Sequence, residues 1–235
     1  MNPIIALNWI DGEWLDSRSY KESFDPATSK VIGRYANGGL SEAQKGIEAA
    51  RRAFTQTPWK DDRQLRAQVL LELADAFERN AHELIETLAL ENGKIKSEAQ
   101  FEVSMVPSKL RYYAALARAE YGRAAEPKPG KISLVIRQAV GVAGIIAPWN
   151  SPVVLMIRSL APALAAGCTA VIKMPGQTAQ TNTLLSRIIS QALSLPKGVI
   201  NLFSELGSEG SKHLVESPYV PVISFTGSTS TGRSI

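Results

Sequence analysis

Residues 138–173 read QAVGVAGIIAPWNSPVVLMIRSLAPALAAGCTAVIK, and they carry only two charged side chains, Arg158 and Lys173. The first part of this stretch, residues 139–147, is rich in valine and isoleucine and alternates too little for a half-exposed strand. Strands of parallel sheets are covered on both faces and therefore have such continuous apolar runs. The pattern predicts a buried strand of a parallel sheet.

A turn and a helix follow this strand. Residues 148–150 break the strand, Asn150 or Ser151 is suited to cap a helix, and apolar residues continue to a stop at Gly167. A second buried strand is expected at residues 169–173. Strand, helix and strand form a βαβ crossover, whose first turn lies at the carboxyl end of the sheet. Open α/β sheets bind ligands at this edge.

A membrane-spanning helix is the alternative for this region, because residues 138–157 form an uncharged run of about 20 residues. Pro148, Asn150 and Pro152 argue against it, since a break within lipid would leave backbone groups without hydrogen-bond partners. We therefore expect no membrane segment.

The composition is that of a soluble globular protein: of 235 residues, 45% are hydrophobic and 20% are charged. The basic residues behind the net charge of +4 are scattered among acids, so no nucleic-acid partner is expected. A single cysteine excludes an intramolecular disulfide framework, and the first 14 residues lack a signal-peptide pattern, so a cytoplasmic location is expected. His82 and His213 have no acid or thiol at ligand spacing, and no metal site is expected.

The remaining sequence predicts further helices and strands. Residues 8–14 resemble a hairpin turning at Asp11-Gly12, and the period becomes helical from Ser41, which is suited to a cap. A turn-rich connector is expected at 124–130 and an exposed strand or hairpin arm at 131–138. The other predicted helices are 61–80, 81–91, 97–121, 180–193 and 208–216, and the other predicted strands are 199–203 and 221–226. This order predicts an α/β fold with a doubly wound parallel sheet, preceded by an N-terminal helical segment.

The last residues, 225–235, read as the end of a strand, a glycine turn and the start of a helix. A helix of one partial turn cannot offset its nucleation cost or cover a sheet. We therefore expect the chain to be a fragment of a longer polypeptide.

Three features could carry chemistry. The turn at 227–232 would present backbone N–H groups to a phosphate, with a purely structural glycine turn as the alternative. It nearly fits a P-loop, but Arg233 stands where that motif needs a lysine. Lys173 ends a buried strand and would either reach the ligand crevice or be solvated. Asn150 could donate to an oxyanion or cap the next helix. Cys168, in contrast, is expected to pack in the core, because it lies at the entry to a buried strand.

Several segments resemble the aldehyde dehydrogenase superfamily. Three of them are GVAGIIAPWNSPVV at 141–154, AAGCTAVIKMPGQTAQT at 165–181 and ISFTGSTSTGRSI at 223–235. Two more are WIDGEW at 9–14 and FDPATSKVIG at 24–33. The resemblance covers essentially the whole chain, but about the first half of such an enzyme.

The resemblance implies a Rossmann-like NAD(P)-binding domain over residues 1–235, truncated before the catalytic domain, with residues 123–138 as a protruding oligomerisation hairpin. The parent enzyme would oxidise an aldehyde to a carboxylic acid with NAD or NADP and form homo-oligomers. Asn150 would be the catalytic oxyanion donor. The implied cofactor contacts are Ile146, Ala147, Pro148, Trp149, Lys173, Gly176, Gln177, Gly207, Phe225, Thr226, Gly227, Ser228 and Thr231.

Two departures from the family pattern concern the cofactor. Gly176 stands where the family commonly has a glutamate that bonds the ribose hydroxyls. The loss of that acid removes a repulsion against a 2′-phosphate, so NADP is expected to be accepted at least as well as NAD. The second glycine of loop 206–211 is shifted, which concerns the pyrophosphate contact of Gly207.

The resemblance places the nucleophilic cysteine and the general-base glutamate of such enzymes beyond Ile235, and Cys168 does not correspond to that cysteine. The chain by itself is therefore expected to be inactive. Two other functions stay open: a non-catalytic interaction module that keeps the fold, and a P-loop-like nucleotide-binding protein.

Overall fold

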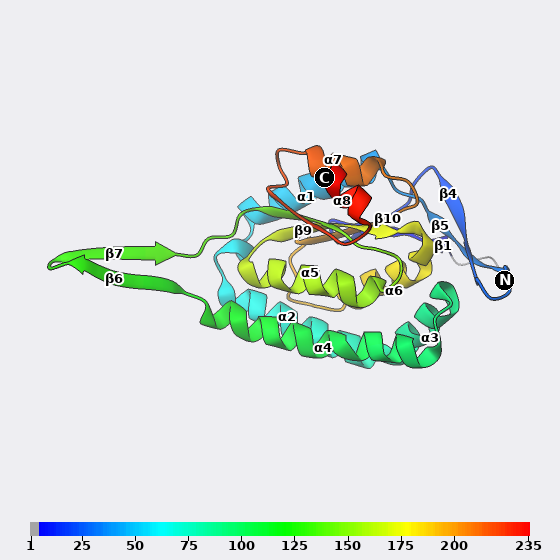
Figure 1. Cartoon of the computed structure of the whole chain (residues 1–235), viewed down its shortest axis with the longest axis horizontal. Coiled ribbons are helices and arrows are strands. Elements are labelled where there is room, and N and C mark those ends of the chain that lie inside the picture. The colour runs from blue at the N-terminus through cyan, green and yellow to red at the C-terminus, as the bar shows by residue number, and fades with distance from the viewer. Residues whose placement is uncertain (1–4) are drawn as a thin grey trace.

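A six-stranded sheet with the strand order β11-β8-β9-β10-β2-β3 forms the centre of the molecule (Figure 1). The computed structural model describes residues 5–235. β8 (Val142–Ile146), β9 (Thr169–Pro175), β10 (Ile200–Glu205) and β11 (Val222–Phe225) run parallel to one another. These four strands confirm the predicted parallel sheet.

The N-terminal hairpin adds two antiparallel strands, so the sheet is mixed and not parallel throughout. β2 (Asn8–Ile10) pairs with β10, and β3 (Glu13–Leu15) forms the outer edge. The hairpin turns at Asp11-Gly12 as predicted, with φ values of 56° and 74°. Two successive left-handed residues match the twist of a tight hairpin.

The order of the parallel strands reverses at β8. From β8 the chain proceeds to β9 and β10 on one side and then returns to place β11 on the other side of β8. Ile146 is paired with Lys173 of β9 and with Phe225 of β11, so β8 and β11 end side by side, and β9 continues two residues further to Pro175. A crevice forms outside the carboxyl ends of strands where the order reverses in this way.

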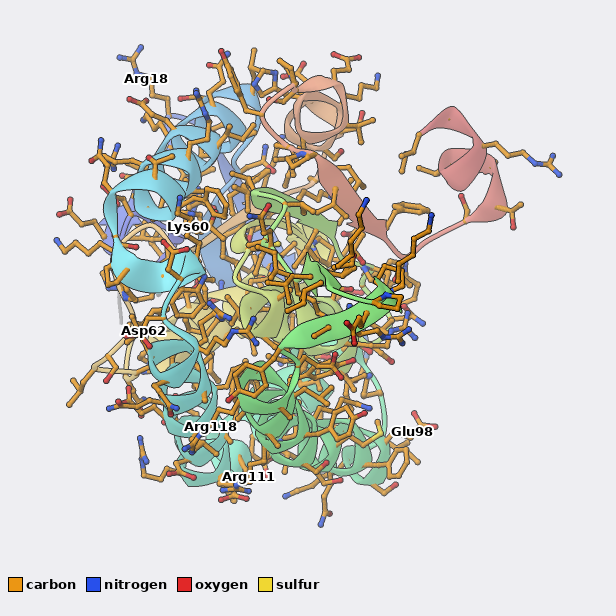
Figure 2. All side chains as sticks on the ribbon, turned by 90° about the vertical axis from the view of Figure 1, so that its left-hand side faces the viewer. Arg18, Lys60, Asp62, Glu98, Arg111 and Arg118 are labelled. Atoms are coloured by element: carbon orange, nitrogen blue, oxygen red, sulfur yellow. The ribbon has the colours of Figure 1, made fainter. Side chains whose placement is uncertain are left out.

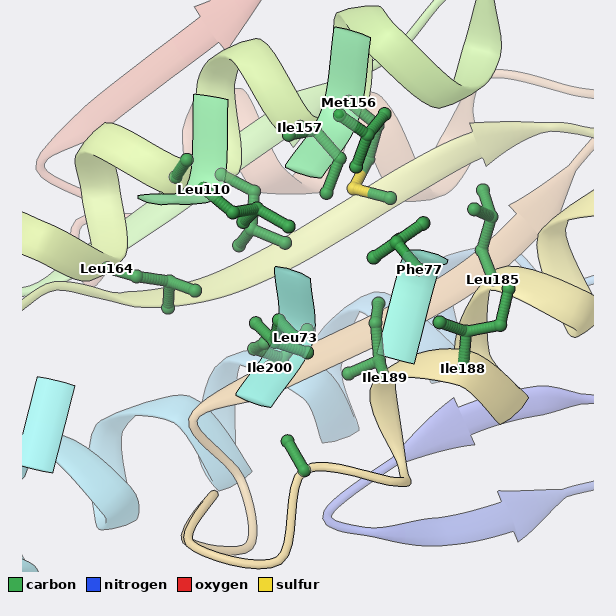
Figure 3. Packing of buried hydrophobic residues seen from close by; sticks show 14 of the residues in the cluster. Leu73, Phe77, Leu110, Met156, Ile157, Leu164, Leu185, Ile188, Ile189 and Ile200 are labelled. Atoms are coloured by element: carbon green, nitrogen blue, oxygen red, sulfur yellow. The ribbon is translucent and has the colours of Figure 1, made fainter. Parts of the chain in front are cut away.

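Helices cover both faces of the sheet, as in a doubly wound fold. α5 (Pro152–Ala166) and α6 (Ala179–Ile189) lie on one face of the sheet. α2 (Arg63–Arg79) and α4 (Lys96–Ala119) pack against them on the side away from the sheet (Figure 1). Side chains from these four helices and from β10 interdigitate in the larger apolar core (Figure 3). This core fixes the strand ends that carry the candidate site.

The opposite face is covered by α1 (Leu40–Gln56) and α7 (Glu209–Glu216), which enclose a smaller apolar core. α1 begins before the predicted cap: Gly39 is the N-cap, and the Glu42 carboxylate accepts its N–H at 2.9 Å. The predicted cap at Ser41 is therefore wrong, because Glu42 supplies this hydrogen bond from inside the helix.

The helices that precede the main crossover unit follow the prediction closely. A short 3-10 turn, η1 (Pro58–Lys60), leads into α2, and α3 (Ala81–Asn92) ends at Gly93. Gly93 has a φ of 75°, a left-handed conformation that suits glycine after a helix. α4 continues through Pro107.

α6 is shorter than predicted and ends at Ile189 instead of residue 193. The chain turns after this point toward α2, where the Glu72 carboxylate accepts both the N–H and the hydroxyl of Ser194, at 2.9 and 2.7 Å. This contact with another helix holds the segment after α6 in a non-helical turn, which the local helical pattern does not reveal.

A second sheet of three strands was not predicted. It contains β1 (Ile5–Ala6), β4 (Tyr20–Phe24) and β5 (Val31–Ala36) in the order β1-β5-β4. β4 reads YKESF and is largely exposed, so it lacks the apolar alternation of a half-buried strand. Its pairing with β5 makes it a strand.

A long hairpin projects from the body (Figure 1). Its strands are β6 (Gly122–Lys128) and β7 (Lys131–Ile136), and every residue of both strands is exposed. The predicted connector at 124–130 is therefore mostly a strand. Pairing with β7 extends it, although its sequence has the proline and glycine of a turn. Figure 2 views the molecule from the tip of this hairpin.

The last element is α8 (Thr229–Ser234), which has no buried residue. None of the helices within residues 5–235 combines the length and the apolar character needed to cross a membrane. The stretch weighed as a membrane span is instead divided between β8, a turn and α5.

Candidate functional site

Backbone hydrogen bonds join the carboxyl ends of β8, β9 and β11. The Ala147 N–H donates to the Lys173 carbonyl at 3.1 Å, and the Thr226 N–H donates to the Ile146 carbonyl at 3.2 Å. These four residues, all expected to contact a cofactor, thus lie side by side where the strand order reverses. The fold places them together although 80 positions, 146 to 226, separate the first from the last.

The three helices that follow β8, β9 and β10 each begin at a buried carboxylate. Glu102 accepts two first-turn N–H groups of α5, at 2.9 and 3.1 Å. Glu91 does the same for α6, at 2.8 and 2.8 Å, and Glu205 for α7, at 2.8 and 3.2 Å. Burial raises the pKa of the Glu91 carboxyl, whereas the hydrogen bonds that it accepts act in the opposite direction. Helix N-termini attract anions, but protein carboxylates already occupy these three.

The turn after β11 is built differently. Ser228 is the N-cap of α8, and its neutral hydroxyl accepts the Thr231 N–H at 3.2 Å. Gly227 lets the backbone pass the Phe225 ring, since a Cβ at this position would lie 2.4 Å from a ring atom. No carboxylate within residues 5–235 accepts a hydrogen bond from this turn. A phosphate would therefore meet no protein anion here.

The turn that carries Asn150 is held by its backbone. Asn92 donates to the Trp149 carbonyl at 2.6 Å, and the Lys94 ammonium donates to the Asn150 carbonyl at 2.8 Å. Pro148 is half-buried, while the Trp149 and Asn150 side chains are exposed. Asn92 is the last residue of α3 and Lys94 comes just after it, so a segment distant in sequence positions this turn.

The carboxamide of Asn150 is not used as a helix cap. Ser151 occupies the N-cap position of α5 without a side-chain hydrogen bond, and Glu102 supplies the capping acceptors. The Asn150 side chain forms no hydrogen bond with any residue from 5 to 235. Of the two predicted caps, Ser151 has the N-cap position but does not cap with its side chain, and Asn150 is not the cap, so its carboxamide is left available to a ligand.

The sequence did not reveal the ion pair that supports this turn. Lys94 and Glu102 form a salt bridge in which their side chains are 10% and 5% exposed. Glu102 lies on the buried face of α4, between Ala99 and Val106, where a charged residue is unusual. An acid at an apolar position of the helix was the sequence feature that could have indicated the ion pair, since a buried acid needs a partner.

Lys173 is only partly exposed, and it forms no salt bridge with residues 5–235. Burial lowers the pKa of its ammonium, and the charge of Glu205 acts in the opposite direction. The alternative of a well-solvated lysine at a strand end does not fit this environment. A ligand oxygen would restore hydrogen bonds that burial has removed.

The loops after β9 and β10 contain the other expected contacts. Gly176 begins η2 (Gly176–Thr178) and is buried, whereas Gln177 is exposed. Gly207 is exposed and has room for a side chain, since its Cβ would meet only Glu205 at 3.8 Å. The second glycine of this loop, Gly210, packs against Phe203, where a Cβ would lie 2.7 Å from the ring. Gly210, at the shifted position, therefore allows close packing against the Phe203 ring.

The thiol of Cys168 is buried, and its carbonyl accepts the Trp59 indole N–H at 2.9 Å. This agrees with a packing role. Within residues 5–235 no group of three or more His, Cys, Asp or Glu residues is arranged to hold a metal ion.

Comparison with known proteins finds one family match that covers most of the chain. The model of the aldehyde dehydrogenase family matches residues 14–235. Geranial dehydrogenase of Castellaniella defragrans is 39% identical over 232 residues, which make up 97% of this chain and 48% of that protein. The chain spans about half the length of the curated relatives it resembles.

Two solved structures have the same fold. HpcC of Thermus thermophilus superposes with a TM-score of 0.92 at 34% identity, over 98% of this chain and 45% of that one. The NAD+ complex of an aldehyde dehydrogenase of Bacillus cereus gives 0.94 at 30% identity, over 98% and 48%. The chain belongs to the aldehyde dehydrogenase family.

Proposed function

We propose that this chain is the NAD(P)-binding part of an enzyme that oxidises an aldehyde to a carboxylic acid. The observation that carries the proposal is the unengaged carboxamide of Asn150, beside the joined ends of β8, β9 and β11. A structural asparagine would cap α5, but Glu102 does so instead. A carboxamide donor fits the developing charge of an oxyanion.

The crevice offers separate groups for each part of a dinucleotide. Lys173 would bind the adenosine ribose or a phosphate on it, and Asn150 would donate to the substrate oxygen. When bound, the cofactor supplies the hydride acceptor. The pyrophosphate would lie against the turn after β11, because the other helix starts are neutralised by carboxylates. The residues proposed to line the dinucleotide are Ile146, Ala147, Pro148, Trp149, Gly176, Gln177, Gly207, Phe225, Thr226, Gly227, Ser228 and Thr231.

The first test is thermal unfolding of the chain with NADP, NAD and ATP. A ligand that binds only the folded state adds about 2.7 kcal/mol of stability at a hundredfold excess over its dissociation constant. We expect the unfolding midpoint to rise with NADP, and with NAD, but not with ATP. A rise with ATP and magnesium alone would favour the P-loop-like alternative. A folded chain, verified by circular dichroism, that responds to none of the three would contradict the proposal.

The same samples test whether the chain is active by itself. We propose that the nucleophilic cysteine and the general-base glutamate belong to another part of the enzyme. Adding an aldehyde should therefore give no steady formation of NADH or NADPH by absorbance. Continuous turnover by purified chain would show that these groups are present here.

We further propose that the β6–β7 hairpin, which forms most of the segment 123–138, joins two copies of this chain. Ile132, Leu134 and Ile136 of β7 are 77%, 70% and 68% exposed, an apolar row on a projecting arm. Exposed apolar rows of this kind mark interaction surfaces. Analytical ultracentrifugation should give dimers or larger particles that become monomers when Leu134 and Ile136 are replaced by serine. Monomers of the unsubstituted chain would contradict this, and binding to a different chain would support the interaction-module alternative.

The single, buried Cys168 supports the further proposal of a cytoplasmic location, because proteins there keep their thiols reduced. Separating cell fractions and probing each for the chain would test it. Recovery outside the cytoplasm would contradict it.

A further inference from the structure

A cavity of about 750 Å³ opens beside the loops that follow β9 and β10. Gly176 and Leu206 line it from these loops, and Trp149 lines it from the turn after β8. Tyr35 and Arg34 of β5 line it from the second sheet. The cavity therefore adjoins the proposed position of the adenosine ribose.

Tyr35 is 2% exposed, and its hydroxyl forms no hydrogen bond with any residue from 5 to 235. Every fully buried polar side-chain atom of residues 5–235 is paired, so the unpaired Tyr35 hydroxyl keeps access to solvent, and Tyr35 lines the cavity. Burial and the charge of Glu91 raise the pKa of Tyr35, so its hydroxyl stays protonated near neutral pH and can donate. A ligand oxygen in the cavity would therefore take the place of water as the partner of this hydroxyl.

The Tyr35 hydroxyl occupies the space of a side chain on Gly176. A Cβ built on Gly176 would lie 2.5 Å from the hydroxyl oxygen and 3.0 Å from the Leu206 nitrogen. Tyr35 has little room to withdraw, because Ala6 and Ala179 pack against it. The position of the Tyr35 hydroxyl therefore requires that residue 176 has no side chain.

Residues at the end of this strand, β9, select between a ribose with a free 2′-hydroxyl and a ribose with a 2′-phosphate. In dinucleotide-binding folds, an acid about 20 residues after the first turn accepts the ribose 2′-hydroxyl, and basic groups nearby accept a 2′-phosphate instead. At the end of β9 this chain has Gly176, where no acid can be accommodated. Lys21 and Arg34 line the cavity, and so do Glu22 and Glu91, of which Glu91 already binds the start of α6.

We infer that Tyr35 determines cofactor specificity by donating its hydroxyl hydrogen bond to the 2′-phosphate of a phosphorylated dinucleotide such as NADP. The inference rests on the proposed function, because it concerns the same site. It assigns to β5 a role in cofactor binding. Tyr35 takes the place of an acid that would repel the phosphate.

The test compares Tyr35→Phe with Tyr20→Phe, using titration calorimetry with NADP and NAD. Tyr20 lines the same cavity, but its hydroxyl already donates to Asp16, so it is a matched control. A hydrogen bond to a charged group is lost only in the first variant, and NADP should bind about tenfold more weakly to it. NAD affinity should change less than about twofold in either variant, since NAD has no 2′-phosphate for Tyr35 to bind.

Unfolding without ligand distinguishes this role from a structural one. Tyr35→Phe should unfold at the same midpoint as the original chain or higher, because the removed hydroxyl has no protein partner. Unchanged NADP affinity, or an equal loss for NADP and NAD, would overturn the inference while leaving the proposed function intact. If the original chain binds neither dinucleotide, the proposed function fails and the inference fails with it.

Discussion

Replacing Glu102 with alanine is expected to lower the free energy of unfolding by about 3–5 kcal/mol. The side chain is 5% exposed, accepts two N–H groups of α5, and is paired with the ammonium of Lys94. Alanine would leave a buried lysine charge without its partner and the start of α5 without its cap. Urea unfolding followed by circular dichroism measures the loss.

The matched control is Glu98→Ala, one turn earlier on α4. Glu98 points away from the body (Figure 2), and its alanine variant should lose less than about 1 kcal/mol, the usual contribution of an exposed acid in a first turn. If the two variants unfolded at the same urea concentration, Glu102 would not be the group that holds α5 and the Asn150 turn.

Replacing Lys173 with alanine is expected to weaken binding of NADP and NAD about 10- to 100-fold, the range of one or two hydrogen bonds to a charged group. The ammonium is partly buried and has no salt bridge within residues 5–235, so the folded chain gains little from it without a ligand. Stability of the free chain should therefore stay equal or rise. Calorimetric titration and urea unfolding of the same samples measure the two effects.

The pH dependence of dinucleotide affinity and of stability provides a second test of Lys173. The ammonium is charged below its pKa, which burial lowers in the folded chain. Dinucleotide affinity should therefore fall as pH rises through that lowered pKa. In the window between it and the ordinary lysine pKa, the unfolded chain binds more protons, so stability without ligand should rise with pH. Lys128→Ala, on the exposed hairpin, is the control for both measurements, and an equal loss of affinity there would contradict a specific role for Lys173.

The parallel core was predictable from local pattern. Residues 139–147 and 169–173 are apolar without alternation because both faces of β8 and β9 are covered, and Gly167 ends α5 in a left-handed conformation with a φ of 92°. β4 was not predicted, and local pattern gave a connector in place of β6, which only the family resemblance indicated as part of a hairpin, because the residues of both strands are mostly exposed. An exposed strand gains its hydrogen bonds from a neighbour and needs no apolar pattern of its own.

The candidate site was predictable only in part. Asn150, Lys173 and the 225–228 turn stand at the ends of recognisable strands, so their place at the ligand-binding edge follows from strand order. The sequence left two roles open for Asn150, cap or oxyanion donor, because its neighbours on the chain permit both. Glu102, which is 48 positions before Asn150, decides between them.

The sequence by itself determined the α/β class, the position of the crevice and the family, since these depend on short-range periodicity and on motifs that are contiguous in the chain. Only the tertiary structure decided which groups in the crevice are already engaged. Glu91, Glu102 and Glu205 close three helix starts, while the Asn150 carboxamide and the Tyr35 hydroxyl are left without protein partners. Hydrogen bonds depend on distance in space, and four of these five groups find or lack their partners through contacts between segments far apart in the sequence.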